Sequence, residues 1–232
     1  MADEPRTFTE HLEELRSRLI KSIIFVIIAA GIVYNFIKVI MPNLTKPVGK
    51  LVFIAPQEAF ITNIKIALFG GLFLASPFVL YQIWRFISAG LERNEVKYAL
   101  IFGPISFLFF LAGAAFAYFI VVPIGIKFLL GFATEYVTPM ISISNYVSFV
   151  GALTLAFGAI FQLPLVSLFL TKIGITTPGF LSRKRRHAIV LIFILAAIIT
   201  PPDIVTQCLM AVPLLVLYEV GIIFSKIAYK PS

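Results

Sequence analysis

Charged residues and cysteine are scarce in this 232-residue sequence. Only 13% of its residues are Asp, Glu, Lys or Arg, whereas soluble domains carry about 25%. The single cysteine, Cys208, excludes an intramolecular disulfide and a cysteine-based metal cage. The two histidines, His11 and His187, lie far apart in the sequence. We therefore expect neither a metal site nor a cofactor.

What the sequence has in excess is apolar side chains. Hydrophobic residues make up 60% of the chain, and 24 residues are Phe. A chain of this length has too little interior to remove so many apolar groups from water. The composition therefore argues against a soluble enzyme, a disordered protein and a disulfide-stapled secreted module. It predicts an integral membrane protein.

Apolar runs long enough to cross a membrane recur along the chain. About 20 residues of helix cover the roughly 30 Å of hydrocarbon. Four such runs are plain, at residues 22–40, 60–84, 98–122 and 146–170. A further stretch, 188–224, carries a Thr-Pro-Pro-Asp sequence in its middle, and a double proline followed by an acid ends a helix. We divide it into spans at 188–200 and 204–224, which completes a single all-α domain of six transmembrane helices.

The basic residues indicate the orientation of these spans. Lys and Arg outnumber Asp and Glu by 19 to 11, a net charge of +8. Basic residues flank the stretch 188–224 at both ends, so both ends should be cytoplasmic and the stretch should cross twice. With both termini inside, fourteen of the nineteen basic residues are cytoplasmic and five lie outside. The excess of basic residues is thus explained by the orientation of the spans in the membrane. We therefore expect no nucleic acid as a partner.

The fifth predicted span is short for a crossing. Residues 188–200 make about 20 Å of helix, less than the thickness of the hydrocarbon. A short span thins the bilayer or draws flanking polar residues to its surface, but a neighbouring helix can equally shield its ends. Both alternatives stay open. We expect the last two helices to be short and the bundle to be open and concave.

Acidic residues on the expected cytoplasmic face form a first candidate site. They are Glu10, Glu13 and Glu14 near the N-terminus, with Glu92 and Glu95 between the second and third spans. Acidic points on a basic face attract a cationic peptide. The alternative is a solvated helix end, in which Glu14 pairs with Arg18 four residues later.

Polar side chains inside the apolar runs form a second group of candidates, because such groups are costly in hydrocarbon. They are Gln162, Asp203, Gln207 and Glu219. Gln162 should lie deepest, Asp203 at the tip of an outer hairpin, and Glu219 within reach of the cytoplasm. The sequence offers no nucleophile–base pair and no relay of carboxylates, so we do not expect an enzyme.

Six segments carry the motifs of a known family. They are HLEELRSRL (11–19), SPFVLYQIWRFISAGLERNE (76–95), AYFIVVP (117–123), SNYVSFV (144–150), FGAIFQLPL (157–165) and TPPDIVTQ (200–207). They occur in order along nearly the whole chain, and in them the sequence resembles TatC, the core subunit of the twin-arginine protein translocase. The family is a six-helix membrane protein with both termini inside.

The resemblance implies a receptor for the twin-arginine signal peptides of folded proteins. It assigns Glu14, Arg16, Phe86 and Glu95 to the signal-peptide site. That assignment fits the chemistry, because a guanidinium prefers the two oxygens of a carboxylate.

Three further positions follow from the same resemblance. Pro47 and Asp203 correspond to outer-side positions that are expected to be structural. Gln162 stands where the family often has Glu, so this chain keeps a polar group there but lacks the titratable charge. A neutral amide at this depth would offer a hydrogen bond to an inserted signal peptide or a partner helix.

The resemblance also implies partners and an energy source. We expect single-span subunits of the TatA/TatB type, membrane lipid and further copies of the chain in the working complex, in the bacterial cytoplasmic (inner) membrane. Transport would use the proton-motive force without ATP, and no phosphate-binding G-x-x-x-x-G-K-[ST] sequence occurs. The alternative is a small-solute secondary transporter or channel, which would need a substrate site between repeated halves, and no internal repeat is visible.

Overall fold

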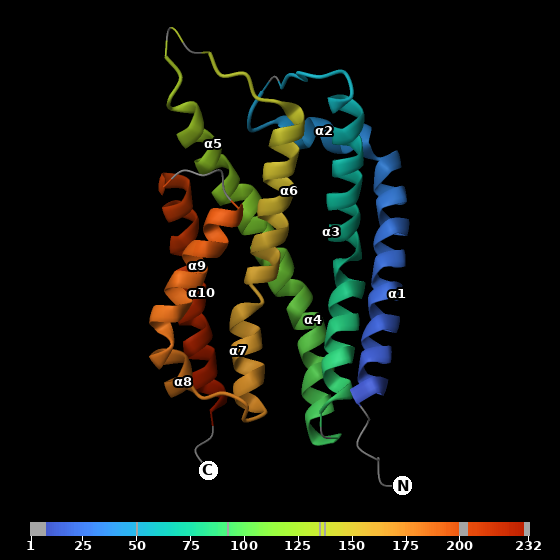
Figure 1. The fold of residues 1–232 in the computed structure, drawn as a ribbon, viewed down its shortest axis with the longest axis vertical. Coiled ribbons are helices and arrows are strands. Elements are labelled where there is room, and N and C mark those ends of the chain that lie inside the picture. The colour runs from blue at the N-terminus through green and yellow to red at the C-terminus, as the bar shows by residue number, and fades with distance from the viewer. Residues whose placement is uncertain are drawn as a thin grey trace.

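Helices form the regular structure of the chain, as the composition predicts. The computed structural model describes residues 8–49, 51–91, 93–134, 136, 138–199 and 204–229, with the backbone alone at 8 and 93–100. Within these residues the one pairing of extended chain is a bridge between Val52 and Ser142, which lie in two loops. Figure 1 shows the helices side by side, with α2 across one end.

The helices follow the apolar runs but differ from them in length. Within the part of the chain that the structure describes, five helical stretches are long and apolar enough to cross a membrane, namely Thr9–Asn35, Glu58–Ala89, Ile101–Leu130, Ile143–Lys172 and Ile204–Ala228. The elements are α1 (Phe8–Asn35), α2 (Ile37–Thr45), α3 (Glu58–Ala89), α4 (Arg93–Phe116), the π-helix η1 (Ala117–Val121), α5 (Val122–Leu130), α6 (Ile143–Ile160), α7 (Leu163–Lys172), α8 (Pro178–Arg183), α9 (Arg185–Ile199) and α10 (Ile204–Ala228). The chain is thus a multi-pass membrane protein.

The two ends of the bundle differ in what they contain. α1 begins and α10 ends at one end, which we call the terminal end (Figure 1). At the opposite end, the α2 end, lie α2 and the loops that follow α2 and α5. The predicted signal-peptide residues of α1 and α3 belong to the terminal end.

The first predicted span, 22–40, ends earlier than expected. α1 stops at Asn35, and Phe36 separates it from α2. The Asn35 side chain donates to the carbonyl oxygen of Gly31 over 2.9 Å, a local hydrogen bond of the kind that competes with a continuing helix. The last apolar residues of that run therefore form α2, which turns across the bundle instead of along it.

Two tyrosines fasten α2 to the bundle. The hydroxyl of Tyr118 in η1 donates to the carbonyl oxygen of Asn43 over 3.1 Å. The hydroxyl of Tyr146 in α6 donates to the carbonyl oxygen of Leu44 over 2.7 Å. Because both acceptors lie in α2, this helix is bonded to two of the long helical segments at once.

The third predicted span, 98–122, continues further than expected. The prediction that this span ends at residue 122 is wrong, because the helix continues as α5 as far as Leu130. Pro123 lies in the first turn of α5, a position where the missing N–H costs little. Immediately before α5, the hydrogen bonds of the helix change from the α pattern to the wider π pattern in η1.

The fourth predicted span, 146–170, is interrupted in its middle. α6 ends at Ile160 and α7 begins at Leu163. Pro164 lies in the first turn of α7 and cannot donate to the carbonyl oxygen of Ile160. The break places Gln162 at the junction of the two helices.

The expectation that the last two helices are both short is right for one and wrong for the other. α9 has 15 residues, about 22 Å of helix, and is shorter than the hydrocarbon. α10 has 25 residues, about 37 Å, and is one of the five long apolar helices. Pro213 lies inside α10 without ending it, and the helix runs past Lys226.

α1 and α3 approach each other closely because two glycines line the contact. A Cβ atom on Gly71 would lie 2.6 Å from the backbone N and Cα of Ala30. A Cβ atom on Gly70 would lie 2.7 Å from Cγ1 of Val33. Residues without side chains let helix backbones come together, and van der Waals contact of this kind is a main source of helix association in lipid.

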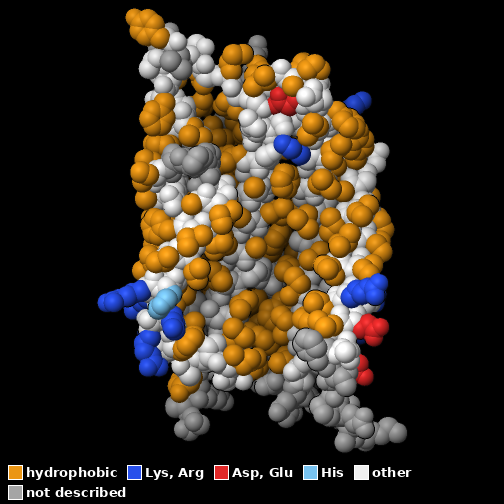
Figure 2. Space-filling model, in the orientation of Figure 1, with side chains coloured by type: hydrophobic (Ala, Val, Ile, Leu, Met, Phe, Trp, Pro, Cys, Tyr) orange, Lys and Arg blue, Asp and Glu red, His pale blue; other side chains and the backbone are white. Residues whose placement is uncertain are grey.

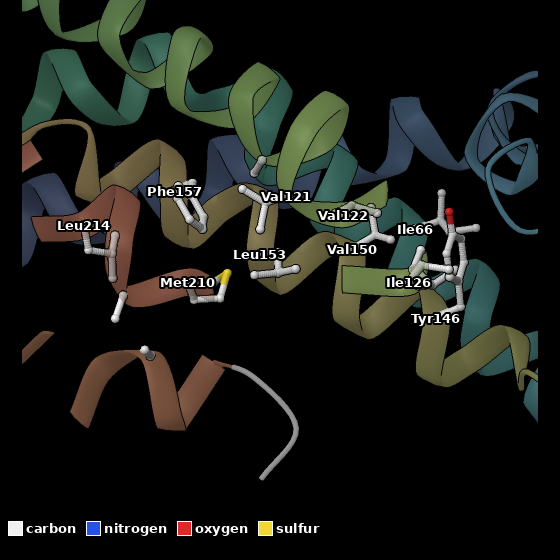
Figure 3. Packing of buried hydrophobic residues seen from close by; sticks show 14 of the residues in the cluster. Ile66, Val121, Val122, Ile126, Tyr146, Val150, Leu153, Phe157, Met210 and Leu214 are labelled. Atoms are coloured by element: carbon white, nitrogen blue, oxygen red, sulfur yellow. The ribbon is translucent and has the colours of Figure 1, made fainter. Parts of the chain in front are cut away.

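α6 supplies the centre of the packing. Leu153 and Phe157 of this helix are fully buried, and Val121, Met210 and Leu214 surround them from η1 and α10 (Figure 3). A second cluster joins α3, α4 and α7, where Trp84, Phe102, Leu165 and Phe169 are buried. α6 therefore lies at the centre of the first cluster, and α3, α4 and α7 form the second.

The outer surface is hydrophobic and suits a lipid environment. Large apolar side chains are exposed on most of the long helices, Ile27, Phe60 and Leu108 among them. Figure 2 shows one face that is mostly hydrophobic and hollowed along its middle, with charged side chains gathered toward its two ends.

Candidate functional site

Glu14 is held by an arginine of its own helix. Nε of Arg18 donates to Oε1 of Glu14 over 3.0 Å, and Nη2 of Arg18 donates to the same oxygen. The two side chains are only 18% and 15% exposed. The pairing of Glu14 with Arg18 that helical spacing offered as an alternative is therefore present.

α3 completes the surroundings of this ion pair. Nη1 of Arg18 donates to Oε1 of Gln82 over 3.1 Å, so the guanidinium connects α1 to α3. Gln82 is buried, and it contributes with Glu14, Ser17, Arg18, Lys21 and Arg85 to a polar cavity of about 290 Å³. We call this space the polar cavity. Glu14 thus opens onto a space where a polar ligand can enter.

Phe86 lies one helical turn after Gln82 and packs against α1. Its ring stacks on His11, with 4.5 Å between the ring centroids and 25° between the planes. The contact places the predicted aromatic residue next to the same stretch of α1 that carries Glu14. The stacking on His11 and the Arg18–Gln82 hydrogen bond both join α1 to α3 in this region. The partnership with His11 was not predicted, because only the fold brings the two rings together.

Other predicted residues are not brought into the polar cavity. Arg16 is exposed and is not among the residues that line the cavity. Residues two apart on a helix point in nearly opposite directions, which separates Arg16 from Glu14 and Arg18. Glu95 lies in the first turn of α4, and its side chain falls outside the described residues, as do Glu92 and Asp203.

Gln162 is bonded to α4 at the break between α6 and α7. Oγ of Ser106 donates to Oε1 of Gln162 over 2.5 Å, and Nε2 of Gln162 donates to the backbone oxygen of Ser106 over 2.9 Å. Ser106 is almost fully buried. The amide therefore already has a partner inside the protein, whereas the sequence suggested a peptide or a partner helix.

We expect this pair of hydrogen bonds to couple α4 to α7. Ser106→Ala and Gln162→Leu should each lower the free energy of unfolding in detergent, and the double variant should lose less than the sum of both. Interhelical hydrogen bonds in membranes contribute about 0.6–2 kcal/mol, which is the coupling expected here. Additive losses in the double-mutant cycle would show that the pair does not act as a unit.

Glu219 also has a partner that the sequence did not reveal. Nη2 of Arg185 donates to Oε2 of Glu219 over 2.8 Å, and both side chains are about half exposed. Arg185 begins α9, so the ion pair joins α9 to α10. A pair this exposed contributes little stability.

Glu58 is a buried carboxylate that the sequence analysis missed. It begins α3 and accepts hydrogen bonds from the hydroxyl of Ser142, the N–H of Ser144 over 3.1 Å and the N–H of Ile54 over 2.6 Å. From sequence alone, an acidic residue at the start of a helix is usually interpreted as a solvent-exposed cap. The only signal was the Ser-Ile-Ser sequence at 142–144, whose partner cannot be identified without the fold.

The α2 end therefore contains a structural polar centre. Glu58 joins the start of α3 to the start of α6, next to the bridge between Val52 and Ser142. Lys65, two turns further along α3, donates to the hydroxyls of Ser144 over 2.6 Å and Ser148 over 2.8 Å. Pro47 is exposed in the turn after α2, at the same end of the molecule.

Comparisons with known proteins give a consistent result. A family model described as "TatC: Sec-independent protein translocase protein (TatC)" matches residues 10–213. The chain is similar to the Sec-independent protein translocase protein TatC of Carboxydothermus hydrogenoformans, with 44% identity over 97% of this chain and 95% of that protein. It is similar to the protein of the same description from Aquifex aeolicus, with 45% identity over 96% and 95% of the two chains.

The fold of this chain is also similar to a solved structure over nearly its whole length. It is described as the crystal structure of the twin arginine translocase receptor TatC, and it matches with a TM-score of 0.87 at 44% identity. The match covers 94% of this chain and 99% of the other.

Proposed function

This chain belongs to the TatC family of Sec-independent protein translocase proteins, and from that membership we propose that it is the receptor for twin-arginine signal peptides of folded proteins. Its site would be the polar cavity between α1 and α3, with Glu14 as the principal carboxylate and Phe86 beside it. Glu95, on the first turn of α4, would supply a second carboxylate, and Arg16 would contribute from the exposed side of α1.

The observation that supports this proposal is the contact between Glu14 and Arg18. The Glu14 carboxylate accepts two N–H groups of a guanidinium at one oxygen, Oε1, so an arginine side chain can approach it at this position. An incoming guanidinium would take the place of Arg18 or share the carboxylate with it. The polar cavity gives it access to that position.

We further propose six crossings with both termini in the cytoplasm, in a bacterial inner membrane. Five long apolar helices and the family match support a multi-pass protein of that membrane. The sixth crossing would be α9, which is short but carries Arg185 and Arg186 at its start. An even number of crossings fits the start of α1 and the end of α10, which lie at the same end of the bundle (Figure 1).

The partners we propose are single-span subunits of the TatA/TatB type, further copies of this chain, and lipid. Support comes from the family and from the extensive apolar surface, including the hollowed face in Figure 2. The protein would act as receptor and scaffold, with export driven by the proton-motive force, and not as an enzyme. Membership of a protein translocase family argues against the small-solute transporter.

Removing both candidate carboxylates tests the receptor proposal. We expect Glu14→Gln combined with Glu95→Gln to weaken binding of a twin-arginine peptide in nanodiscs by about tenfold to a hundredfold, since each lost charged hydrogen bond is worth about 1.5–3 kcal/mol. The matched control is Glu219→Gln, which removes a carboxylate paired with Arg185 elsewhere. Unchanged affinity in the double variant, or equal affinity for a Lys-Lys peptide, would contradict the proposal.

A further inference from the structure

The guanidinium of Arg18 is bonded to acceptors from two helices. Its Nε and Nη2 both donate to Oε1 of Glu14 in α1, and the distance from Nε is 3.0 Å. Its Nη1 donates to Oε1 of Gln82 in α3 over 3.1 Å. All three nitrogens of the guanidinium thus have an acceptor. We call this pair of acceptors, Glu14 and Gln82, the guanidinium site.

The guanidinium site suits arginine better than lysine. Nη1 points away from the edge that Nε and Nη2 form, so the two acceptors lie on different sides of the guanidinium. A guanidinium is a planar fork that spans such a separation, whereas the ammonium of lysine is a single nitrogen. An ammonium that contacts Glu14 would therefore leave Gln82 without a donor from the ligand.

Gln82 is the part of this site with little access to water. Its side chain is buried, and a buried carbonyl oxygen without a donor costs free energy that a solvated one does not. A ligand that supplies the donor is favoured over one that cannot, and sites built on buried polar groups discriminate by this means. Gln82 is thus placed to make the site selective for arginine, while Glu14 attracts either cation.

Arg18 occupies the position that an arginine of a ligand would need. The polar cavity is lined by Glu14, Gln82 and Arg18 itself, so a side chain that enters it meets both acceptors already engaged. Arg18 is four residues from Glu14 on the same helix, a spacing that brings the two side chains together. A partner within the same chain competes at a high effective concentration with any ligand from solution.

We infer, on the basis of the proposed receptor function, that Arg18 is an internal competitor of the signal peptide and that Gln82 selects arginine over lysine. One arginine of the peptide takes the position of the Arg18 guanidinium against Glu14 and Gln82, and the Arg18 side chain turns away. Because one guanidinium replaces another on the same acceptors, this exchange alone adds little affinity. A segment with a single arginine is therefore bound weakly, and a second contact must supply the rest.

Removal of the competitor should tighten binding of the peptide. The dissociation constant of an Arg-Arg signal peptide is measured by fluorescence anisotropy with the full-length protein in nanodiscs. For Arg18→Gln we expect it to fall by about tenfold, since the peptide no longer displaces a charged hydrogen bond. Arg18→Lys keeps the charge but cannot bond both acceptors, so it should give a smaller gain of about threefold. If Arg18 only positioned Glu14, both variants would bind the peptide more weakly than the wild type.

A second background separates competition from the loss of a positive charge. Any cationic peptide gains from removal of a nearby cation, so Arg18→Gln is also made in Glu14→Gln. The competition for the carboxylate is absent there, and we expect a gain of about twofold or less. Arg186→Gln is the control for a cation elsewhere, because Arg186 is exposed at the start of α9 and does not line the polar cavity. It should leave the dissociation constant unchanged.

Gln82→Leu tests the preference for arginine. It is made together with Arg18→Gln, so that the bond between Arg18 and Gln82 is already absent in the reference. We expect the Arg-Arg peptide to bind about fivefold more weakly than it binds Arg18→Gln alone, because one hydrogen bond to a charged group is lost. Binding of a Lys-Lys peptide should change by less than about twofold, because its ammonium does not reach Gln82.

Three results would overturn the inference. They are binding to Arg18→Gln that is no tighter than to the wild type, a gain of the same size in the Glu14→Gln background, and equal losses for the Arg-Arg and Lys-Lys peptides in Gln82→Leu. Each of them leaves the receptor proposal standing as long as Glu14→Gln combined with Glu95→Gln weakens binding, because that variant tests the carboxylates and not the competitor.

Discussion

Gly71→Leu is expected to lower the free energy of unfolding by about 3 kcal/mol, because the added side chain has no space between α1 and α3. Even its Cβ atom would lie 2.6 Å from the backbone N and Cα of Ala30, and backbone atoms cannot rotate away. The helices would have to separate along their whole contact. Unfolding of the purified protein in a mild detergent, followed by circular dichroism, measures the loss.

The matched control for this substitution is Gly31→Leu on α1. The same side chain is added to a transmembrane helix, but a Cβ atom at Gly31 meets nothing within 4 Å. We expect no loss of stability beyond about 0.5 kcal/mol there. Equal stability of the Gly71→Leu and Gly31→Leu variants would mean that α1 and α3 do not pack as closely as described.

Glu58→Ala should release the two loops at the α2 end. The carboxylate accepts from the hydroxyl of Ser142 and from the N–H groups of Ser144, Ile54 and Ala55, so its removal takes the acceptor from four donors. We expect amide hydrogen exchange in peptides covering residues 51–57 and 142–146 to accelerate by about tenfold or more. Exchange in α10 should be unaffected.

Glu13→Ala is the control for the loss of a carboxylate. Glu13 is exposed on α1 at the terminal end, and its replacement should leave exchange in both loops unchanged. Glu58→Gln should lie between the wild type and Glu58→Ala, since an amide keeps one acceptor but offers donors to groups that are themselves donors. Loop exchange that is the same in Glu58→Ala and in the wild type would refute the proposed tether.

The sequence located the apolar runs but not where each helix ends. Runs of apolar residues carry no sign of the turn at Phe36, because the residues of α2 are as hydrophobic as those of α1. Pro123 reads as the start of a loop, yet it occupies the first turn of α5, where proline is tolerated. Composition thus predicts which segments are buried in the membrane, whereas tertiary contacts determine where each helix ends and how it is oriented.

The candidate site was predicted as far as local spacing allows. The pairing of Glu14 with Arg18 follows from their separation of four residues on one helix, and the structure contains it. The contact of Arg18 with Gln82 and the bond between Gln162 and Ser106 join residues more than fifty positions apart. Such pairs become visible only when the helices are placed side by side.

Side-chain hydrogen bonds join different pairs of helices at the two ends of the bundle. At the α2 end, Tyr118 and Tyr146 donate to α2, and Glu58 links α3 to α6. At the other end, Arg18 links α1 to Gln82 of α3, and the hydroxyls of Thr171 and Ser225 link α7 to α10. The helices around the polar cavity thus form two separately bonded pairs, and the apolar cluster of Trp84 and Phe169 lies between them.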